Sequence, residues 1–191
     1  MIRGMDTDGF WALVESGAAG GPACEREERL TARLAALPLP EVLEFQLRLD
    51  EARAPLDTPG TLAVAKTVLR GWVSDDSLWY FYGWLLGLGR DAHHLAVHDL
   101  DALADHPAFR HLAALPYEQW GDDVFPAWET LDYCAHFAYE RLTGEEDGLE
   151  EALAEIGHES PLNAEFDAPV WTPEERAARL PRLTALFADA A

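Results

Sequence analysis

Two adjacent carboxylates, Asp75 and Asp76, stand beside the most aromatic stretch of the sequence and are the first candidates for chemistry. The aromatic side chains that could line a ligand site next to them are Trp72, Tyr80 and Trp84. Carboxylates against aromatic faces can receive a cation, and burial would raise their pKa values. A structural role explains the pair more simply, because Ser74 predicts a helix N-cap and acids in the first turn favour the helix dipole. The aromatic band itself is typical either of a pocket wall or of a core.

Histidines and aspartates between residues 93 and 111 form the densest group of metal-ligating residue types. His94 and His98 are four residues apart, so one helix face could present both imidazoles to a divalent ion, with Asp101 or Asp105 as a third ligand. The glutamate that a zinc protease places after the first histidine is absent, and Asp101 suits the cap of a short helical turn. We therefore expect surface histidines and no cofactor.

No nucleophile with its base is evident. Cys134 and His136 are two residues apart on a predicted helix and so point to different faces. Cys134 is expected in the core. Gly-x-Ser-x-Gly, Walker and dinucleotide-binding motifs are missing, which removes the common enzyme classes and favours a non-catalytic protein.

The charge balance restricts the classes of molecule that the chain can bind. The chain has 35 acidic and 14 basic residues, a formal net charge of −21, and a single lysine, Lys66. This charge disfavours nucleic acid, whose phosphates bind through basic residues, and it disfavours anionic membrane surfaces. It suits a basic protein partner, a cationic ligand, or simply solubility. No stretch is long and apolar enough for a membrane span and no signal segment is recognisable, so we expect a cytoplasmic protein.

Hydrophobic periodicity predicts helices throughout the chain. The first expected helix is entered through an aspartate or threonine cap within residues 6–8 and ends at residue 17. The other expected helical ranges are 25–37, 41–53, 61–73, 74–88, 90–98, 99–105, 126–144, 149–156 and 173–186. Residues 116–125 and 161–170 read as loops, and residues 145–147 as an exposed acidic turn. No segment alternates with a period of two between hairpin turns. The sequence therefore predicts an all-α, single globular multi-helix domain without a sheet.

Two of these helices, and the boundary expected at residue 144, carry specific predictions about burial and domain organisation. The segment from Leu78 to Leu88 is apolar on every side and should be the central helix, surrounded by protein. In the helix expected from Pro126, the predicted buried stripe consists of Trp128, Leu131, Cys134, Ala135, Ala138 and Leu142. We expect residues 1–144 to form a helical core domain and residues 145–191 a helical extension packed on it.

Several motifs together resemble a known bacterial family. The motifs are Met5-Asp6 before Phe10-Trp11, the run from Leu69 to Leu85 with Ser74-Asp75-Asp76 and Tyr80-Phe81, Gly89-Arg90, and Asp99-Leu100-Asp101-Ala102-Leu103-Ala104. Over residues 5–143 the chain resembles the family known as domain of unknown function number 4240. The resemblance implies an all-helical protein and no particular activity. Many members carry arginine after the Tyr-Phe pair, where this chain has Tyr82 and Gly83.

These observations favour a non-catalytic accessory, adaptor or immunity-type protein that binds another protein, which is expected to be basic. The alternative is a small-ligand binder or enzyme with a pocket at Asp75 and Asp76.

Overall fold

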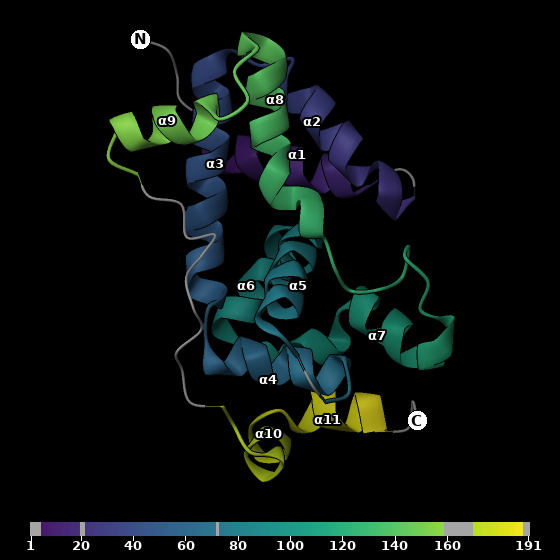
Figure 1. The fold of residues 1–191 in the computed structure, drawn as a ribbon. Helices are drawn as coiled ribbons and strands as arrows, with labels where there is room; N and C mark the ends of the chain where they lie inside the picture. Colours follow the sequence, from purple (N-terminus) through teal and green to yellow (C-terminus); the bar gives the residue numbers. More distant parts are fainter. Residues whose placement is uncertain (1–4, 20–21, 72, 159–169, 189–191) are drawn as a thin grey trace. The chain divides into compact units, whose positions relative to one another are not determined.

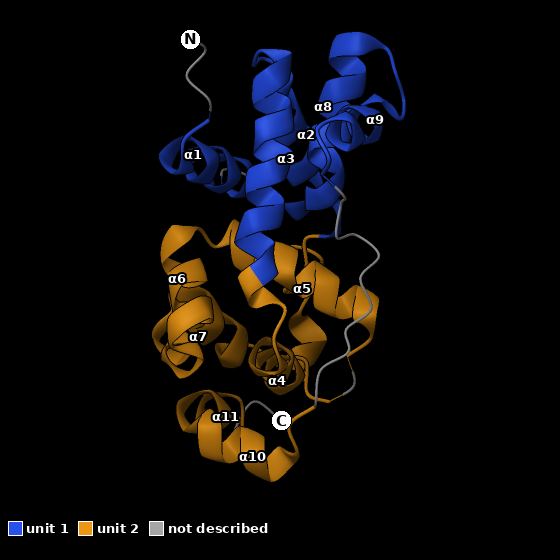
Figure 2. Cartoon of the chain, turned by 90° about the vertical axis from the view of Figure 1, so that its left-hand side faces the viewer, with its two compact units in different colours: residues 1–54, 129–164 blue, residues 55–128, 165–191 orange. Residues whose placement is uncertain are grey.

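The protein is entirely helical. The computed structural model describes residues 5–19, 22–71, 73–158 and 170–188, and within these residues it contains no strand (Figure 1). Contacts divide the chain into two compact units: unit 1 consists of residues 1–54 and 129–164, and unit 2 of residues 55–128 and 165–191 (Figure 2). The predicted all-α fold is confirmed.

Unit 1 combines helices from both halves of the sequence. Its elements are α1 (Thr7–Ala18), the 3-10 turn η1 (Ala23–Glu25), α2 (Arg26–Leu34), α3 (Leu39–Arg53), the 3-10 turn η5 (Glu129–Tyr133), α8 (Cys134–Thr143) and α9 (Gly148–Glu155). Asp6 caps α1 by accepting a hydrogen bond from the Gly9 amide at 2.8 Å, as its sequence position predicts. Helix α8 packs against α2, α3 and α9, and small residues on its inner face, such as Ala135 and Ala138, allow this close approach.

Unit 2 contains the middle of the chain and its last helices. Its elements, after the 3-10 turn η2 (Ala54–Leu56), are α4 (Pro59–Val68), α5 (Asp75–Gly87), α6 (Arg90–His98), η3 (Leu100–Asp105), α7 (Pro107–Ala114), η4 (Tyr117–Gln119), α10 (Pro173–Arg179) and α11 (Pro181–Ala188). Helix α11 packs against η3, α4 and α7 through the buried side chains of Leu183 and Phe187.

Helix α5 is the aromatic-rich central helix that the sequence predicts. Ser74 caps it by accepting a hydrogen bond from the Ser77 amide at 3.1 Å. The residues buried along it are Leu78, Phe81, Tyr82, Gly83, Trp84, Leu85 and Leu86. They cover most of the helix circumference, so burial in the core of unit 2 is the arrangement that keeps them from water.

Some predicted helix boundaries are wrong. The helix expected from Pro126 begins only with η5 at Glu129. Just before it, the Trp128 amide donates a hydrogen bond to the Tyr80 carbonyl at 3.0 Å. In a helix from Pro126 this amide would lie in the first turn without an intrahelical partner, and the tertiary bond satisfies it instead. The helix expected over residues 61–73 ends at Val68, and two residues later Arg70 adopts a left-handed conformation.

Proline decides two further differences. Helix α7 begins at Pro107, which the sequence interpretation treated only as an end, although proline is favoured in the first turn of a helix. The single helix expected from Pro173 is two helices. Pro181 has no backbone N–H to donate to a carbonyl of the preceding turn, so the helix is interrupted at Leu180.

The two units do not follow the expected boundary at Gly144. Helix α9 belongs to unit 1, whereas α10 and α11 belong to unit 2. The loop expected over residues 161–170 lies outside the described residues, except for Val170. None of the described helices is long and apolar enough to cross a membrane.

Candidate functional site

The predicted acidic pair lies in the first turn of α5. Asp75 and Asp76 are both exposed, directly after the capping residue Ser74. This is the position in which carboxylates favour the positive end of the helix dipole. The structural role is therefore realised, and a ligand-binding role for the two acids stays a prediction.

Of the aromatic walls predicted for that site, Trp84 does not lie at the acidic pair. Trp84 is buried and packs against Phe81 and Phe109, with ring centroids 5.3 and 5.1 Å apart, and its place nine residues after Asp75 corresponds to about 13 Å along the helix. Trp84 is thus a core residue. Tyr80 is half-buried on α5. Trp72 lies outside the described residues.

The histidine pair predicted as metal ligands lies on the surface of α6, and its predicted third ligand Asp101 has other partners. The rings of His94 and His98, both exposed, lie 4.5 Å apart on α6. The carboxylate of Asp101 instead accepts hydrogen bonds from the backbone amides of Arg182, at 3.0 Å, and Leu183, at 3.0 Å, at the start of α11. Among the described residues no group of three histidine, cysteine or acidic side chains is placed to hold a metal ion.

Cys134 is a core residue, as the sequence predicts. Its side chain is fully buried and donates a hydrogen bond to the Thr130 carbonyl at 3.3 Å. Burial raises the pKa of its thiol to about 12. Because the thiolate is the nucleophile, this residue is unsuited to covalent catalysis near neutral pH.

A pair of exposed aromatic side chains marks the outer face of α8. Tyr133 is 46% and Phe137 36% exposed, and their rings lie 6.3 Å apart, one helical turn from each other. The predicted stripe is wrong at Leu142, which is 42% exposed. The buried position near this end of the helix is Tyr139, whose ring reaches Gly148 of α9.

Phe137 lies in a surface groove between α2 and α8, which we call the α2–α8 groove. It has a volume of about 380 Å³ and is lined by Glu27, Phe137, Glu140, Arg141 and Gly144. Burying carboxylates beside an aromatic ring without a partner costs free energy. In this surface groove the ring and the carboxylates stay accessible, so a binding partner can contact both. The groove thus offers an apolar contact and negative charge together.

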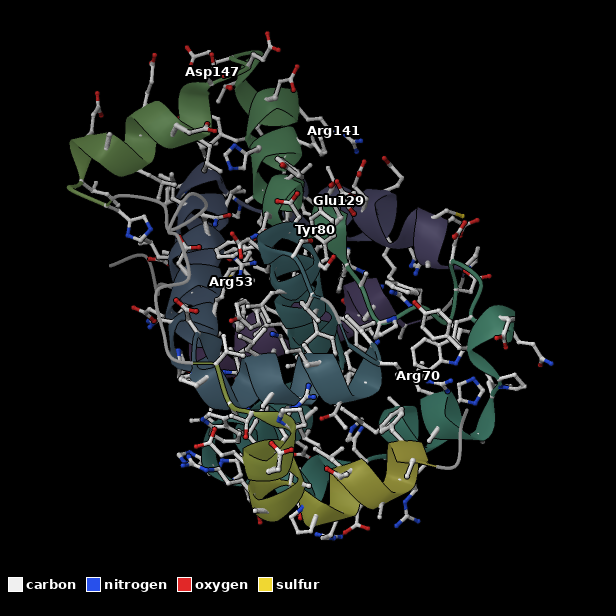
Figure 3. All side chains as sticks on the ribbon, turned by 60° about the horizontal axis from the view of Figure 1, so that its bottom comes forward. Arg53, Arg70, Tyr80, Glu129, Arg141 and Asp147 are labelled. Atoms are coloured by element: carbon white, nitrogen blue, oxygen red, sulfur yellow. The ribbon has the colours of Figure 1, made fainter. Side chains whose placement is uncertain are left out.

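The single cation of the groove is already neutralised. Arg141 (Figure 3) donates two hydrogen bonds to Glu28 of α2, at 3.1 and 2.6 Å. These bonds lower the pKa of Glu28 and raise that of Arg141. Glu27 and Glu140 make no ion pair within 4.0 Å with any described residue, so the groove keeps an excess of negative charge.

A protein-family model described as "Protein of unknown function (DUF4240)" matches residues 5–141. The chain belongs to the DUF4240 family. The DUF4240 match spans the helices from α1 to most of α8, and so includes every residue that lines the α2–α8 groove except Gly144. No curated protein and no solved structure matches the chain.

The helices α9, α10 and α11 lie beyond the part matched to DUF4240. The acidic turn at residues 145–147 is exposed, as predicted, and extends the negative surface next to the groove. From Glu140 to Glu155 the sequence has seven acidic residues and one basic residue. The sequence analysis did not identify this face; the signal that could have indicated it is the run of acidic residues after Glu140 together with the aromatic residues at 133 and 137.

The structure also assembles a buried charge cluster in unit 1 that no sequence motif indicates. Arg53 of α3 (Figure 3) pairs with Asp132 of η5, and its guanidinium lies 3.8 Å from Asp50. Asp50 accepts a hydrogen bond from Gln46 at 3.0 Å and lies 2.7 Å from the His158 ring. Arg53, Asp50 and Asp132 are each at most 5% exposed, which makes the cluster a structural link rather than a surface site.

Proposed function

We propose that this DUF4240 protein is a non-catalytic, protein-binding accessory or adaptor protein whose α2–α8 groove receives a basic segment of another protein. The observation that supports this most directly is Phe137, 36% exposed in a groove where Glu27 and Glu140 have no ion-pair partner among the described residues. An exposed aromatic surrounded by uncompensated carboxylates is typical of a surface that binds cations.

The expected occupant carries an arginine or lysine next to an apolar side chain. Its cation can lie over the ring of Phe137 and pair with Glu27 or Glu140, while the apolar neighbour covers Tyr133. Arginine is favoured because its planar guanidinium both stacks on aromatic rings and binds carboxylates through two hydrogen bonds. The net charge of −21 would in addition attract such a partner from a distance and speed association.

A pair of synthetic peptides tests this proposal on the full chain. The first alternates arginine with leucine, and the second has the same length with glutamate in place of arginine. Titrated into isotope-labelled protein, the arginine peptide should shift the backbone resonances of α2 and α8, and the glutamate peptide should not. Shifts spread evenly over the acidic surface would argue against a defined groove.

Charge-matched variants separate the groove from general electrostatics. Glu27→Gln with Glu140→Gln should weaken binding of the arginine peptide about tenfold, whereas Glu146→Gln with Glu155→Gln, which removes the same charge outside the groove lining, should change it less than twofold. Phe137→Ala should cost about fivefold. Equal losses in the two double variants would contradict the proposal.

A further inference from the structure

Unit 2 contains a pocket of the opposite charge. It lies between the end of α4, α10 and α11, has a volume of about 370 Å³, and its lining includes Lys66, Thr67, Arg70, Arg176, Thr184 and Phe187. We call it the basic pocket. The only lysine of the chain and two of its arginines thus converge on one site, although acids outnumber basic residues by 35 to 14.

The cations of the basic pocket have no acidic partner in the described part of the chain. None of Lys66, Arg70 and Arg176 makes an ion pair within 4.0 Å with a described acidic residue. Six other arginines do have such an acidic partner: Arg29, Arg48, Arg53, Arg110, Arg141 and Arg182. Three uncompensated positive charges around one cavity repel each other, and an anion would remove that repulsion.

The backbone at Arg70 supports a functional role for its side chain. Helix α4 ends with the Gly71 amide donating to the Lys66 carbonyl at 3.0 Å, and Arg70 has a φ of 59°. Among the described residues it is the only non-glycine residue with a positive φ. Glycine is favoured at this position of a helix end because it has no Cβ, so arginine costs free energy there.

What arginine adds at this position is its guanidinium. Arg70 (Figure 3) lines the basic pocket, and its guanidinium lies 5.5 Å from the centre of the Tyr117 ring. Strained backbone of this kind persists where surrounding contacts stabilise it, and it concentrates at functional sites.

We propose that the basic pocket binds a small organic phosphate, whose phosphate group lies among Lys66, Arg70 and Arg176. Guanidinium groups match phosphate oxygens through paired hydrogen bonds, and three positive charges suit a dianion better than a monoanion. Phe187, 6% exposed, provides an apolar contact for the organic part of the ligand. The volume lies within the range of about 300–1,000 Å³ that is usual for small-molecule sites. This proposal is independent of the α2–α8 groove, which belongs to unit 1.

The probe for this proposal is phenyl phosphate, with benzyl alcohol as the uncharged comparison, titrated into the full chain by calorimetry and followed by backbone resonance shifts. Phenyl phosphate should bind saturably and shift resonances at the end of α4 and along α11, and benzyl alcohol should not bind. Lys66→Gln with Arg176→Gln should weaken binding at least tenfold. The matched control, Arg33→Gln with Arg48→Gln, lowers the charge equally in unit 1 and should leave affinity within twofold.

Arg70→Gly distinguishes a ligand-binding role from a structural one. Glycine relieves the strained φ, so the thermal midpoint should stay unchanged or rise while phenyl phosphate affinity falls at least fivefold. A lower midpoint with unchanged affinity would overturn the proposal. Absence of saturable binding to the native chain, or equal loss in the matched control variant, would overturn it as well.

Discussion

At the scale of single residues, the buried cluster around Arg53 shows how much depends on a partner distant in sequence. Arg53 and Asp132 are 79 positions apart and both almost fully buried. Taking the two charges out of water is costly, and their pairing offsets this cost only while both are present. The cluster therefore links α3 to η5 and makes the packing of unit 1 sensitive to either residue.

Replacing Asp132 by asparagine should destabilise the protein by about 3 kcal/mol, because it removes a buried carboxylate that pairs with the Arg53 guanidinium. Urea unfolding of the full chain measures the loss. Glu51→Gln is the matched control, since Glu51 pairs with Arg48 at 2.7 Å on the surface, and it should cost less than about 1 kcal/mol. Similar losses in the two variants would show that the buried cluster has no special role.

The contribution of His106 to stability depends on pH. It is the N-cap of α7, where its Nδ1 accepts a hydrogen bond from the Ala108 amide at 3.3 Å. Burial lowers its pKa below the ordinary value, against a smaller raising effect of Asp91. Protonation would also remove the acceptor that caps the helix.

The sign of the resulting pH dependence follows from linkage. The unfolded state takes up the proton at a higher pH than the folded state, so the contribution of His106 to stability is complete above about pH 6.5 and is lost as the pH falls through the lower folded-state pKa. Asparagine caps helices without titrating in this range. His106→Asn should therefore lose less stability than the native chain between about pH 7.5 and pH 5.5 in urea unfolding. An identical loss in both proteins would contradict this assignment.

At the scale of elements, α5 is positioned by a close backbone approach. A Cβ on Gly83 would lie 2.4 Å from the Trp128 carbonyl oxygen. Gly83 is one helical turn after Tyr80, whose carbonyl accepts the hydrogen bond from the Trp128 amide. Glycine inside a helix costs about 1 kcal/mol relative to alanine, so its presence here reflects this contact rather than helix propensity. The same contact sets where the chain leaves unit 2.

Gly83→Ala should accordingly destabilise the protein, by about 1–3 kcal/mol, despite the better helix propensity of alanine, because backbone must move to admit the methyl group. The thermal midpoint and the free energy of unfolding measure the effect. Gly121→Ala is the control, because a Cβ at Gly121 would meet nothing within 4 Å, and this variant should be neutral or slightly stabilising. A stabilised Gly83→Ala variant would show that the Trp128 segment adapts freely.

At the scale of the whole molecule, the dominant property is the net charge of −21. Most carboxylates are exposed, so they repel one another in the folded chain, and this repulsion weakens when salt screens it. Stability and binding of a basic partner should therefore respond to salt in opposite directions.

Raising the NaCl concentration from about 0.01 to 0.15 M shortens the screening length from about 30 to 8 Å. The thermal midpoint should rise by roughly 3–5 °C over this range, while the affinity for the arginine peptide should fall. Calorimetric scans and peptide titrations in the same buffers check both. A midpoint that changes only at molar salt would point to preferential hydration instead of screening.

The sequence by itself determined the features that depend on near neighbours. Helix periodicity, the caps at Asp6 and Ser74 and the apolar circumference of α5 predicted an all-α fold, because these signals act within one or two helical turns. Pro181 was also a local signal, for the break between α10 and α11, but the prediction did not use it.

Tertiary structure alone decided which distant residues meet. The Trp128 amide bonds to the distant Tyr80 carbonyl just before η5 begins, and Asp101 caps α11 instead of joining His94 and His98. The α2–α8 groove and the basic pocket each combine segments about 100 residues apart. With 35 acidic and 14 basic residues, the sequence allows many pairings of similar Coulomb energy, and only packing selects which of them are made and which cations remain unpaired.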